Sequence, residues 1–367
     1  MEMPHQEWFT SDLIDRHIYL EEQLGDGDGG NFLSGWQCIN PWQCTIDSEI
    51  VEKRQSITPS TYLYADRYPE IERAFSDLHQ STDGCPPERI LFGAGSTQLL
   101  LLITAWIRSR NMSEVFYIAP MYHTLHWSLK TLGVRSRPVN SRHPFEPQFS
   151  INLPDKETVL IVTDPIWYSG TRMSPEVIEK IAAWQSATNS VIVIDGSFQY
   201  MEWERPVESS IGCLDPSLTI RVVCPTKQLI LHGYRASYAL IPGRLHRYLA
   251  TLNSMMFASL SIDTVAFLLA APNLIMQQAF PRKLMSLAAH RHHQLRAKGL
   301  IRASWSPDCG YFCFEKLCKT GLEEQALMSG RYFEQSRYPD HHRINLLSPQ
   351  ITALCSDVDT GLSVELS

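Results

Sequence analysis

The sequence predicts an α/β protein with a mostly parallel β-sheet that is covered by helices on both faces, followed by a smaller α+β unit. Short apolar runs alternate with amphipathic segments through the middle of the chain, which is the pattern of successive strand–helix units. The runs are apolar throughout, as expected for strands with both faces buried. With 367 residues and 44% hydrophobic residues, the chain is long enough for two folded units with substantial cores.

The predicted strands and helices follow one another in a regular order. The strands cover residues 89–92, 115–119, 159–163, 191–194, 220–224 and 238–241. Amphipathic helices between them cover 97–110 and 175–188. The second helix has a clear start signal, because Ser174 suits the N-cap and Pro175 suits the first helical position.

The pattern changes after the last of these strands and divides the chain into three parts. A long helical region is predicted over 262–300 with a break at Pro281, and strand-like pieces follow at 310–317 and 343–347. Glycines and acidic residues at 25–30 predict an irregular arm near the N-terminus. We therefore expect an arm that belongs with the small domain over 1–45, a large domain over 46–265 and a C-terminal small domain over 266–367.

Composition excludes several classes of function. The net charge is −7 and the 32 lysines and arginines are scattered, so no nucleic-acid partner is expected. No unbroken apolar stretch is long enough to span a bilayer, and the first residues show no signal-peptide pattern, so no membrane partner is expected. The nine cysteines are odd in number and match no disulfide framework, which predicts a reducing cytoplasm.

One cysteine spacing is similar to that of a metal site. Cys309, Cys313 and Cys318 are close in sequence, but the apolar residues between them predict a strand. The alternation of a strand would point Cys313 and Cys318 to opposite faces. We therefore interpret these cysteines as structural thiols and expect no metal.

Chemistry-bearing residues follow the predicted strands. In open parallel sheets, ligands bind beyond the carboxyl ends of the strands. The residues at these ends are a Gly-x-Gly-Ser-Thr loop at 93–97, Tyr122, an Asp-Pro pair at 164–165, Asp195 and Lys227. A glycine loop that enters a helix, an aromatic ring, carboxylates and a lysine are what a phosphate-bearing aromatic cofactor needs.

Lys227 is the most informative of these residues. It stands at the mouth of an apolar strand, and Arg235 follows eight residues later. Burial and nearby positive charge lower a lysine's pKa, so that its amine can be nucleophilic near neutral pH and can hold pyridoxal phosphate as a Schiff base. Arg235 would then bind the phosphate. The alternatives are a surface lysine and a surface arginine.

The other candidates each have a role and an alternative. Asp195 could pair with the protonated pyridine nitrogen of this cofactor, or could cap a turn. Tyr122 could lie flat on the pyridine ring, or could be a core aromatic. Arg343 could hold a substrate carboxylate bidentately, or could lie at the surface. The loop at 93–97 could bind phosphate through free N–H groups at a helix start, or could only make the turn.

The segment Lys227-x5-Gly233-x-Arg235, with Asp195 on the preceding strand, resembles the class I and II aminotransferases, which are fold-type-I pyridoxal-phosphate enzymes. The resemblance covers about residues 62–349. It implies a large domain with a mostly parallel sheet of the seven-stranded type and a smaller α+β domain. It also implies that Lys227 forms the internal aldimine and moves the proton from Cα to C4′, and that Asp195 pairs with the ring nitrogen.

The resemblance also assigns the remaining site residues. It implies a homodimer with shared active sites, in which Tyr64 reaches the phosphate of the neighbouring subunit. The α-carboxylate of the substrate is assigned to Arg343, and Tyr122 stacks on the cofactor ring. The cofactor phosphate is assigned to Gly95, Ser96, Thr97 and Arg235.

The chain departs from the family's pattern around the cofactor. The asparagine that hydrogen-bonds the phenolic oxygen of the cofactor is Trp167 here, and the tyrosine that shares this oxygen is Phe198. The indole N–H of Trp167 or the hydroxyl of Tyr168 could replace these donors, and Trp167 could also line the substrate pocket. The phosphate-binding serine three residues before the lysine is Cys224, and a glycine two residues after the arginine is Ser237.

These departures leave two hypotheses for the reaction. The first is an aminotransferase that moves an amino group between a small amino acid and a 2-oxo acid by a ping-pong route. Weaker hydrogen bonding to the phenolic oxygen should raise the pKa of the imine, because the unprotonated form loses stabilisation. The second hypothesis is therefore a lyase, decarboxylase, cyclase or oxidase that acts on an amino acid with the same cofactor.

Overall fold

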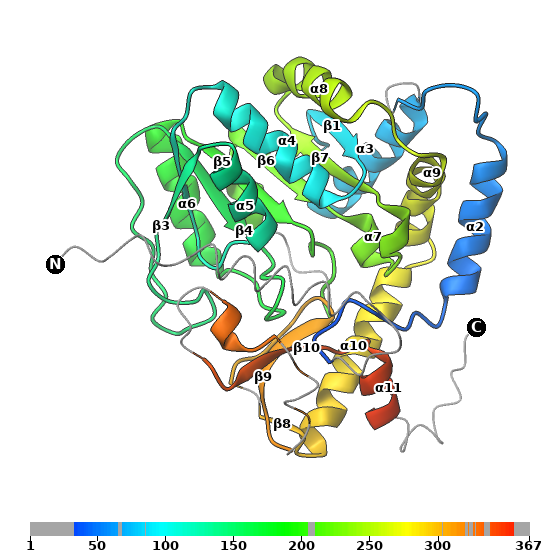
Figure 1. Ribbon diagram of the computed structural model, residues 1–367, viewed down its shortest axis with the longest axis vertical. Coiled ribbons are helices and arrows are strands. Elements are labelled where there is room, and N and C mark those ends of the chain that lie inside the picture. The colour runs from blue at the N-terminus through cyan, green and yellow to red at the C-terminus, as the bar shows by residue number, and fades with distance from the viewer. Residues whose placement is uncertain are drawn as a thin grey trace.

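The computed structural model describes residues 33–64, 68–84, 86–204, 210–302, 304–319, 322, 326, 328–333 and 338–355. Most of the arm that is expected over 1–45, including its glycine-rich stretch, lies outside these residues. The described residues form a large β-sheet with helices packed on it, in the upper part of Figure 1, and a small β-sheet below it.

The large sheet has seven strands and is mostly parallel, as predicted. The strands are β1 Arg89–Gly93, β2 Glu114–Tyr117, β3 Arg135–Pro138, β4 Val159–Thr163, β5 Val191–Gly196, β6 Thr219–Val223 and β7 Ser237–Ile241. Their order across the sheet is β1-β7-β6-β5-β4-β2-β3. Strands β2 to β6 pair in parallel, whereas β7 is antiparallel to both of its neighbours.

Helices cover both faces of the large sheet. The helices of the described residues are α2 Gln43–Gln55, α3 Pro69–Asp83, α4 Ser96–Ser109, α5 His123–Thr131, α6 Pro175–Thr188, α7 Pro225–Gln228, α8 Gly243–Phe257, α9 Ile262–Met276, α10 Phe280–Ala297 and α11 Pro349–Cys355. In β4, Val159 and Ile161 pack with α4, α5 and α8, whereas Leu160 and Val162 pack with α6. Because successive residues enter opposite cores, the strand is apolar throughout.

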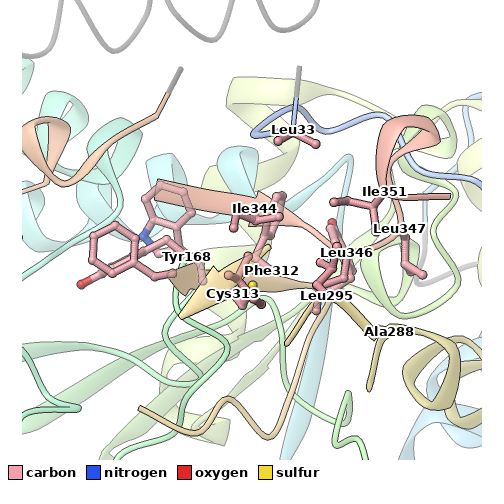
Figure 2. Packing of buried hydrophobic residues seen from close by; sticks show 14 of the residues in the cluster. Leu33, Tyr168, Ala288, Leu295, Phe312, Cys313, Ile344, Leu346, Leu347 and Ile351 are labelled. Atoms are coloured by element: carbon pink, nitrogen blue, oxygen red, sulfur yellow. The ribbon is translucent and has the colours of Figure 1, made fainter. Parts of the chain in front are cut away.

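The small sheet is antiparallel and packs on α10 and α11. Its strands, in the order β10-β9-β8, are β8 Ile301–Arg302, β9 Phe312–Leu317 and β10 His341–Asn345. Figure 2 shows Phe312 and Ile344 of this sheet in one cluster with Leu295 of α10 and Ile351 of α11. The same cluster contains Trp167 from a loop of the large sheet, so one core joins the two sheets. The residue limits of the domains stay a prediction.

Strand β3 is a part of the large sheet that the sequence pattern does not predict. It lies at the edge of the sheet, and its residues are exposed and half-buried in turn. An edge strand tolerates polar residues and a proline, because one of its sides makes no ladder hydrogen bonds. The sequence Arg-Ser-Arg-Pro of β3 therefore carries no apolar signal.

The helical region predicted over 262–300 with a break at Pro281 consists of two helices. Helix α9 ends at Met276 and α10 begins at Phe280, with Ala279 between them in the left-handed conformation at φ 52°. The expected break at Pro281 is therefore wrong in position. Pro281 lies in the first turn of α10, where the missing N–H of proline has no intrahelical partner to lose.

The thiols and the apolar helices of the described residues have the following features. Cys313 lies in β9 and is buried, whereas Cys318 follows the strand and is exposed. The cysteines of the described residues are free thiols, and no cluster of His, Cys, Asp or Glu among those residues could hold a metal ion. Within the same ranges, no helix is both long and apolar enough to cross a membrane.

Candidate active site

A cavity of about 330 Å³ lies at the carboxyl ends of β5 and β6. The register pairs Asp195 with Val222 and Gly196 with Val223, so these two strands end side by side. Asp195 and Lys227 therefore reach the same cavity from neighbouring strands. Most of the site residues expected from the sequence line this cavity, namely Gly95, Ser96, Thr97, Tyr122, Trp167, Asp195, Phe198, Cys224, Lys227 and Arg235.

Lys227 lies in the short helix α7, which begins directly after β6 with Pro225 in its first turn. Its side chain is half-buried, and its Nζ lies 3.8 Å from the ring centroid of Trp36 and 5.2 Å from that of Phe198. The alternative of a surface lysine is therefore wrong. An ammonium group over an aromatic face is attracted by the ring, so the two aromatic residues hold the amine inside the cavity.

Asp195 both lines the cavity and caps the turn that follows β5. The residue is 4% exposed, and its Oδ1 accepts hydrogen bonds from the hydroxyl and the N–H of Ser197 at 2.6 and 3.2 Å. Burial raises the pKa of Asp195, although Ser197 and the charge of Lys227 act in the opposite direction. A buried carboxylate of this kind is stabilised by a cationic N–H partner.

The start of α4 forms a positively polarised cradle on the same cavity. The helix begins at Ser96, one residue earlier than predicted, and its N-cap is Gly95 at φ 97°. This positive φ favours glycine, and a Cβ atom at this position would lie 2.6 Å from Nη2 of Arg235. The N–H groups of the first helical turn and the Arg235 guanidinium together make a site for an anion such as phosphate.

Aromatic side chains form other walls of the cavity. The rings of Tyr122 and Trp167 meet edge to face with their centroids 5.5 Å apart. The rings of Trp36 and Phe198 both lie near the Lys227 amine. The cavity therefore combines an anion cradle, a buried carboxylate, an amine and flat apolar walls.

The sequence matches the family described as Aminotransferase class I and II over residues 31–350. The chain belongs to this family. It is thus an enzyme of the aminotransferase type, as the resemblance predicts. No curated protein sequence matches the chain closely enough to count as a relative.

Several solved structures share the fold of this enzyme. N-succinyldiaminopimelate aminotransferase from Mycobacterium tuberculosis superposes with a TM-score of 0.71 at 14% identity, over 93% of this chain and 96% of that one. Substrate-bound BacF from Bacillus subtilis gives 0.75 at 14% identity, over 97% of each chain. YbdL from Escherichia coli, with a methionine aminotransferase function, gives 0.71 at 14% identity, over 97% of this chain and 98% of that one.

Tyr168 of the aminotransferase lies outside the cavity. Its hydroxyl oxygen is 2.6 Å from Nδ1 of His143, and its ring stacks on Phe333 with the centroids 4.0 Å apart. Figure 2 shows Tyr168 in the core of the small sheet. The structure therefore does not support Tyr168 as a donor to the cofactor, because its hydroxyl is directed to His143.

Arg343 and Tyr64 are also absent from the walls of the cavity among the described residues. Arg343 is 0% exposed, so the alternative of a surface arginine is wrong. Its Nε and Nη2 donate to the carbonyl of Ser34, and its guanidinium lies 4.8 Å from the ring centroid of Trp36 and 5.1 Å from that of Trp167. Arg343 thus lies directly behind the aromatic wall, whereas Tyr64 is half-buried beside Tyr62.

Sequence reasoning missed four residues of this cavity. His232 lies between Lys227 and Arg235 in the chain, and this position is the signal that could have found it. Its Nε2 is 3.2 Å from the Tyr311 hydroxyl, and burial, followed by the charges of Lys227 and Arg235, lowers its pKa to about 3. His232 is therefore neutral at neutral pH. The other residues without a predicted role are Trp36, Ser197 and Thr226, of which the last two stand close to Asp195 and Lys227 in the sequence.

The residues of the aminotransferase cavity fit pyridoxal phosphate. The Gly95–Arg235 contact leaves a cradle that a Cβ atom would fill, which suits the phosphate. Asp195 suits a protonated ring nitrogen, and Lys227 suits the aldehyde. Trp167 and Phe198 stand where the family has its usual donors to the phenolic oxygen, and both line the cavity.

Proposed function

We propose that this aminotransferase uses pyridoxal 5′-phosphate, held through Lys227, to move an amino group between an amino acid and a 2-oxo acid. When bound, the cofactor supplies an aldehyde that condenses with amines and a ring that withdraws electrons. The observation that carries the proposal is the placement of Lys227 and Asp195 at the ends of adjacent strands, on one cavity with the anion cradle of Gly95 and Arg235.

Each residue of the cavity then has a distinct task. Arg235 and the N–H groups at the start of α4 bind the phosphate and fix the position of the ring. Asp195 holds the proton on the ring nitrogen, because a buried carboxylate favours a cationic partner. The amine of Lys227 would remove the proton from the substrate Cα and deliver it to C4′ of the cofactor. Tyr122 and Trp167 exclude water from this step.

We also propose Arg343 as the residue that binds the α-carboxylate of the substrate. Its guanidinium contacts the rings of Trp36 and Trp167, which line the cavity, and this proximity supports the role. Its guanidinium is held through Nε and Nη2 on the Ser34 carbonyl, which orients the group before a substrate arrives. Such preorganisation reduces the entropy lost on binding.

Transfer of the amino group is tested by mixing the enzyme and cofactor with single amino acids and a panel of 2-oxo acids. We expect two products in equal amounts: the amino acid formed from the added 2-oxo acid, and the 2-oxo acid formed from the added amino acid. Without an added 2-oxo acid, turnover should not continue. Continued product formation without any 2-oxo acid would instead indicate the lyase, decarboxylase, cyclase or oxidase chemistry that the Trp167 and Phe198 replacements allow.

Asp195→Asn should reduce turnover by at least ~10²-fold while the fold is kept, because a preorganised charge partner is lost. Steady-state kinetics at saturating cofactor measure the effect, and circular dichroism checks the fold. Asp215→Asn, at an exposed carboxylate before β6, is the matched control and should leave turnover unchanged. Near-normal turnover of Asp195→Asn would show that the carboxylate only caps the turn at Ser197.

The enzyme is further proposed to be a homodimer in which Tyr64 binds the cofactor phosphate of the partner subunit. Tyr64→Phe should then weaken cofactor retention by about 1 kcal/mol, which is the usual worth of one hydrogen bond. Cofactor dissociation followed by absorbance measures this, and Tyr62→Phe at the neighbouring exposed ring is the control. A fully active monomer at micromolar concentration in the ultracentrifuge would contradict the shared site.

The cytoplasm is the proposed compartment of the enzyme. The free thiols of the described cysteines support it, because thiols persist in a reducing environment.

A further inference from the structure

The guanidinium of Arg343 is covered by aromatic rings. Arg343 lies in the middle of β10 and is 0% exposed. Its Cζ lies 4.7 Å from the ring centroid of Phe312, 4.8 Å from that of Trp36 and 5.1 Å from that of Trp167. A carboxylate binds a guanidinium through N–H groups that it can reach directly. It therefore reaches Arg343 only after a side chain that covers this arginine has moved.

Of these three rings, that of Trp36 is the one that can move most easily. Phe312 belongs to β9 and is 1% exposed, and Trp167 is 5% exposed. Both belong to the buried core that joins the two sheets, whereas Trp36 is half-buried at its margin, in a segment without helix or strand. Displacing a core ring would open a void, which is costly. A half-buried indole can exchange its contacts for water.

Strand β10 holds the backbone on both sides of Trp36. Nδ2 of Asn345 donates hydrogen bonds to the carbonyls of Gly35 and Gln37, at 2.8 and 2.9 Å. Asn345 and Arg343 are two residues apart in the strand, so their side chains lie on the same face. The backbone around Trp36 is therefore fixed relative to the arginine. The ring can leave only by rotation about its side-chain bonds.

The ring of Trp36 also contacts the second group that a substrate must reach. Its centroid lies 3.8 Å from Nζ of Lys227, in addition to its contact with Arg343. The proposed reaction needs the substrate Cα beside the lysine amine and the α-carboxylate on the arginine. Because the ring lies against both groups, the ring and a bound amino acid compete for the same space.

We infer that Trp36 is a gate to the carboxylate site, whose ring covers Arg343 until the carboxylate of a substrate displaces it. This inference rests on the role of Arg343 in the proposed function. A guanidinium is attracted by an aromatic face, but its paired hydrogen bonds with a carboxylate are stronger. A carboxylate thus displaces the ring, whereas a neutral group of the same shape does not compensate for the lost contact.

The experiment is calorimetric titration of the cofactor-loaded enzyme with propanoate, 4-methylpentanoate and 3-phenylpropanoate. These acids carry a carboxylate but no amine, so they bind without reacting. The affinity of a ligand is lowered by the fraction of molecules whose site is open. Trp36→Ala should therefore bind the acids at least ~5-fold more tightly than the wild type, as expected for a gate that is open in ~20% of molecules or fewer.

Unchanged or weaker binding of the acids by Trp36→Ala would overturn the inference. The corresponding amides are the controls for shape, and they should bind the wild type more weakly than the acids do. Amides that bind as tightly as the acids would show that the carboxylate does not displace the ring, which would also overturn it.

Two further variants separate the gate from a structural effect. Trp36→Phe keeps an aromatic face at this position, so its affinity for the acids should return to within ~3-fold of the wild type. Trp127→Ala removes an indole that is 45% exposed on α5 and outside the cavity, and it should bind the acids as the wild type does. Tighter binding by Trp127→Ala, or by Trp36→Phe as much as by Trp36→Ala, would contradict the gate. Circular dichroism checks that each variant folds.

Tryptophan emission provides a readout that does not depend on affinity. Saturation of the wild type with an acid should shift the emission to longer wavelength, because the indole of Trp36 moves from apolar rings into water. The shift should be at least halved in Trp36→Phe, although the acid still binds. A shift of the same size in Trp36→Phe would mean that another tryptophan moves, and it would overturn the inference.

Arg343→Lys separates a failure of the gate from a failure of the proposed function. Lysine keeps the charge but lacks the planar fork that holds a carboxylate. Acid binding should fall by at least ~10-fold, with Trp36 or with Ala at position 36. Unchanged binding in Arg343→Lys would refute Arg343 as the carboxylate site, and the gate with it. An effect of Arg343→Lys without any effect of Trp36→Ala would refute the gate alone.

Discussion

Lys227→Ala should lower turnover by at least ~10³-fold, because one substitution removes both the covalent anchor of the cofactor and the group that moves the Cα proton. The same variant should lose the visible absorbance of the bound cofactor. Borohydride reduction of the wild-type enzyme, followed by peptide mapping, should place the label on Lys227 alone. The physical basis is the position of this amine, which two aromatic rings hold inside the cavity at the end of β6.

A second lysine provides the control for this experiment. Lys130 lies in the last turn of α5 and outside the cavity, so Lys130→Ala should retain both absorbance and turnover. A label on any lysine other than Lys227, or no label, would contradict the assignment. Turnover of Lys227→Ala within ~10-fold of wild type would do so as well.

Asp83→Asn should destabilise the protein by about 3–5 kcal/mol, because it leaves the buried guanidinium of Arg221 without its counter-charge. Asp83 is the centre of a buried network outside the active-site cavity. It is bonded to Arg221, its Oδ2 lies 2.9 Å from His79 Nδ1, and it accepts from the Tyr200 hydroxyl at 2.8 Å. Urea unfolding followed by tryptophan fluorescence measures the loss.

The network around Asp83 should make the stability of the protein depend on pH. Burial alone would raise the pKa of Asp83, but the hydrogen bond to His79 and the charge of Arg221 outweigh it and hold the pKa well below its usual range. A lowered folded-state pKa stabilises the protein above the unfolded value of about 4, and this stabilisation is lost as the pH falls further. Wild-type stability should therefore fall more steeply below pH 4 than that of Asp83→Asn.

Asp77→Asn, at an exposed position of the same helix, is the matched control. It should change the free energy of unfolding by less than about 0.5 kcal/mol, as is usual for surface substitutions. A similarly small effect of Asp83→Asn would show that the network around Arg221 is not under the expected electrostatic constraint.

The large sheet could be predicted from the sequence because its signals are local. The central strands are short and mainly apolar. Asp195 is recognisable because it directly follows the apolar run 191–194, and Lys227 because it follows β6 by four residues. The phosphate cradle could be predicted for the same reason, because Gly95 directly precedes α4 in the sequence. The polar edge strand β3 carries no such signal, and neither does the short link between α9 and α10.

The orientation of side chains around the cavity could not be predicted in the same way. Trp167 and Tyr168 are neighbours, yet one lines the cavity and the other bonds His143 in the core of the small sheet. Trp36 comes from a segment nearly 200 residues before Lys227, and its ring nevertheless lies 3.8 Å from the lysine amine. Such contacts depend on how the small sheet packs against the loops of the large one.

By itself, the sequence determined the α/β class, the parallel sheet and the candidate residues Asp195, Lys227 and Arg235. It could do so because the end of a strand and a glycine turn are each recognisable from consecutive residues. Only the tertiary structure decided that Arg343 is buried behind two tryptophans and that His232 and Trp36 belong to the site. These features join residues far apart in the chain, and their positions follow from the packing of two sheets, which no local pattern encodes.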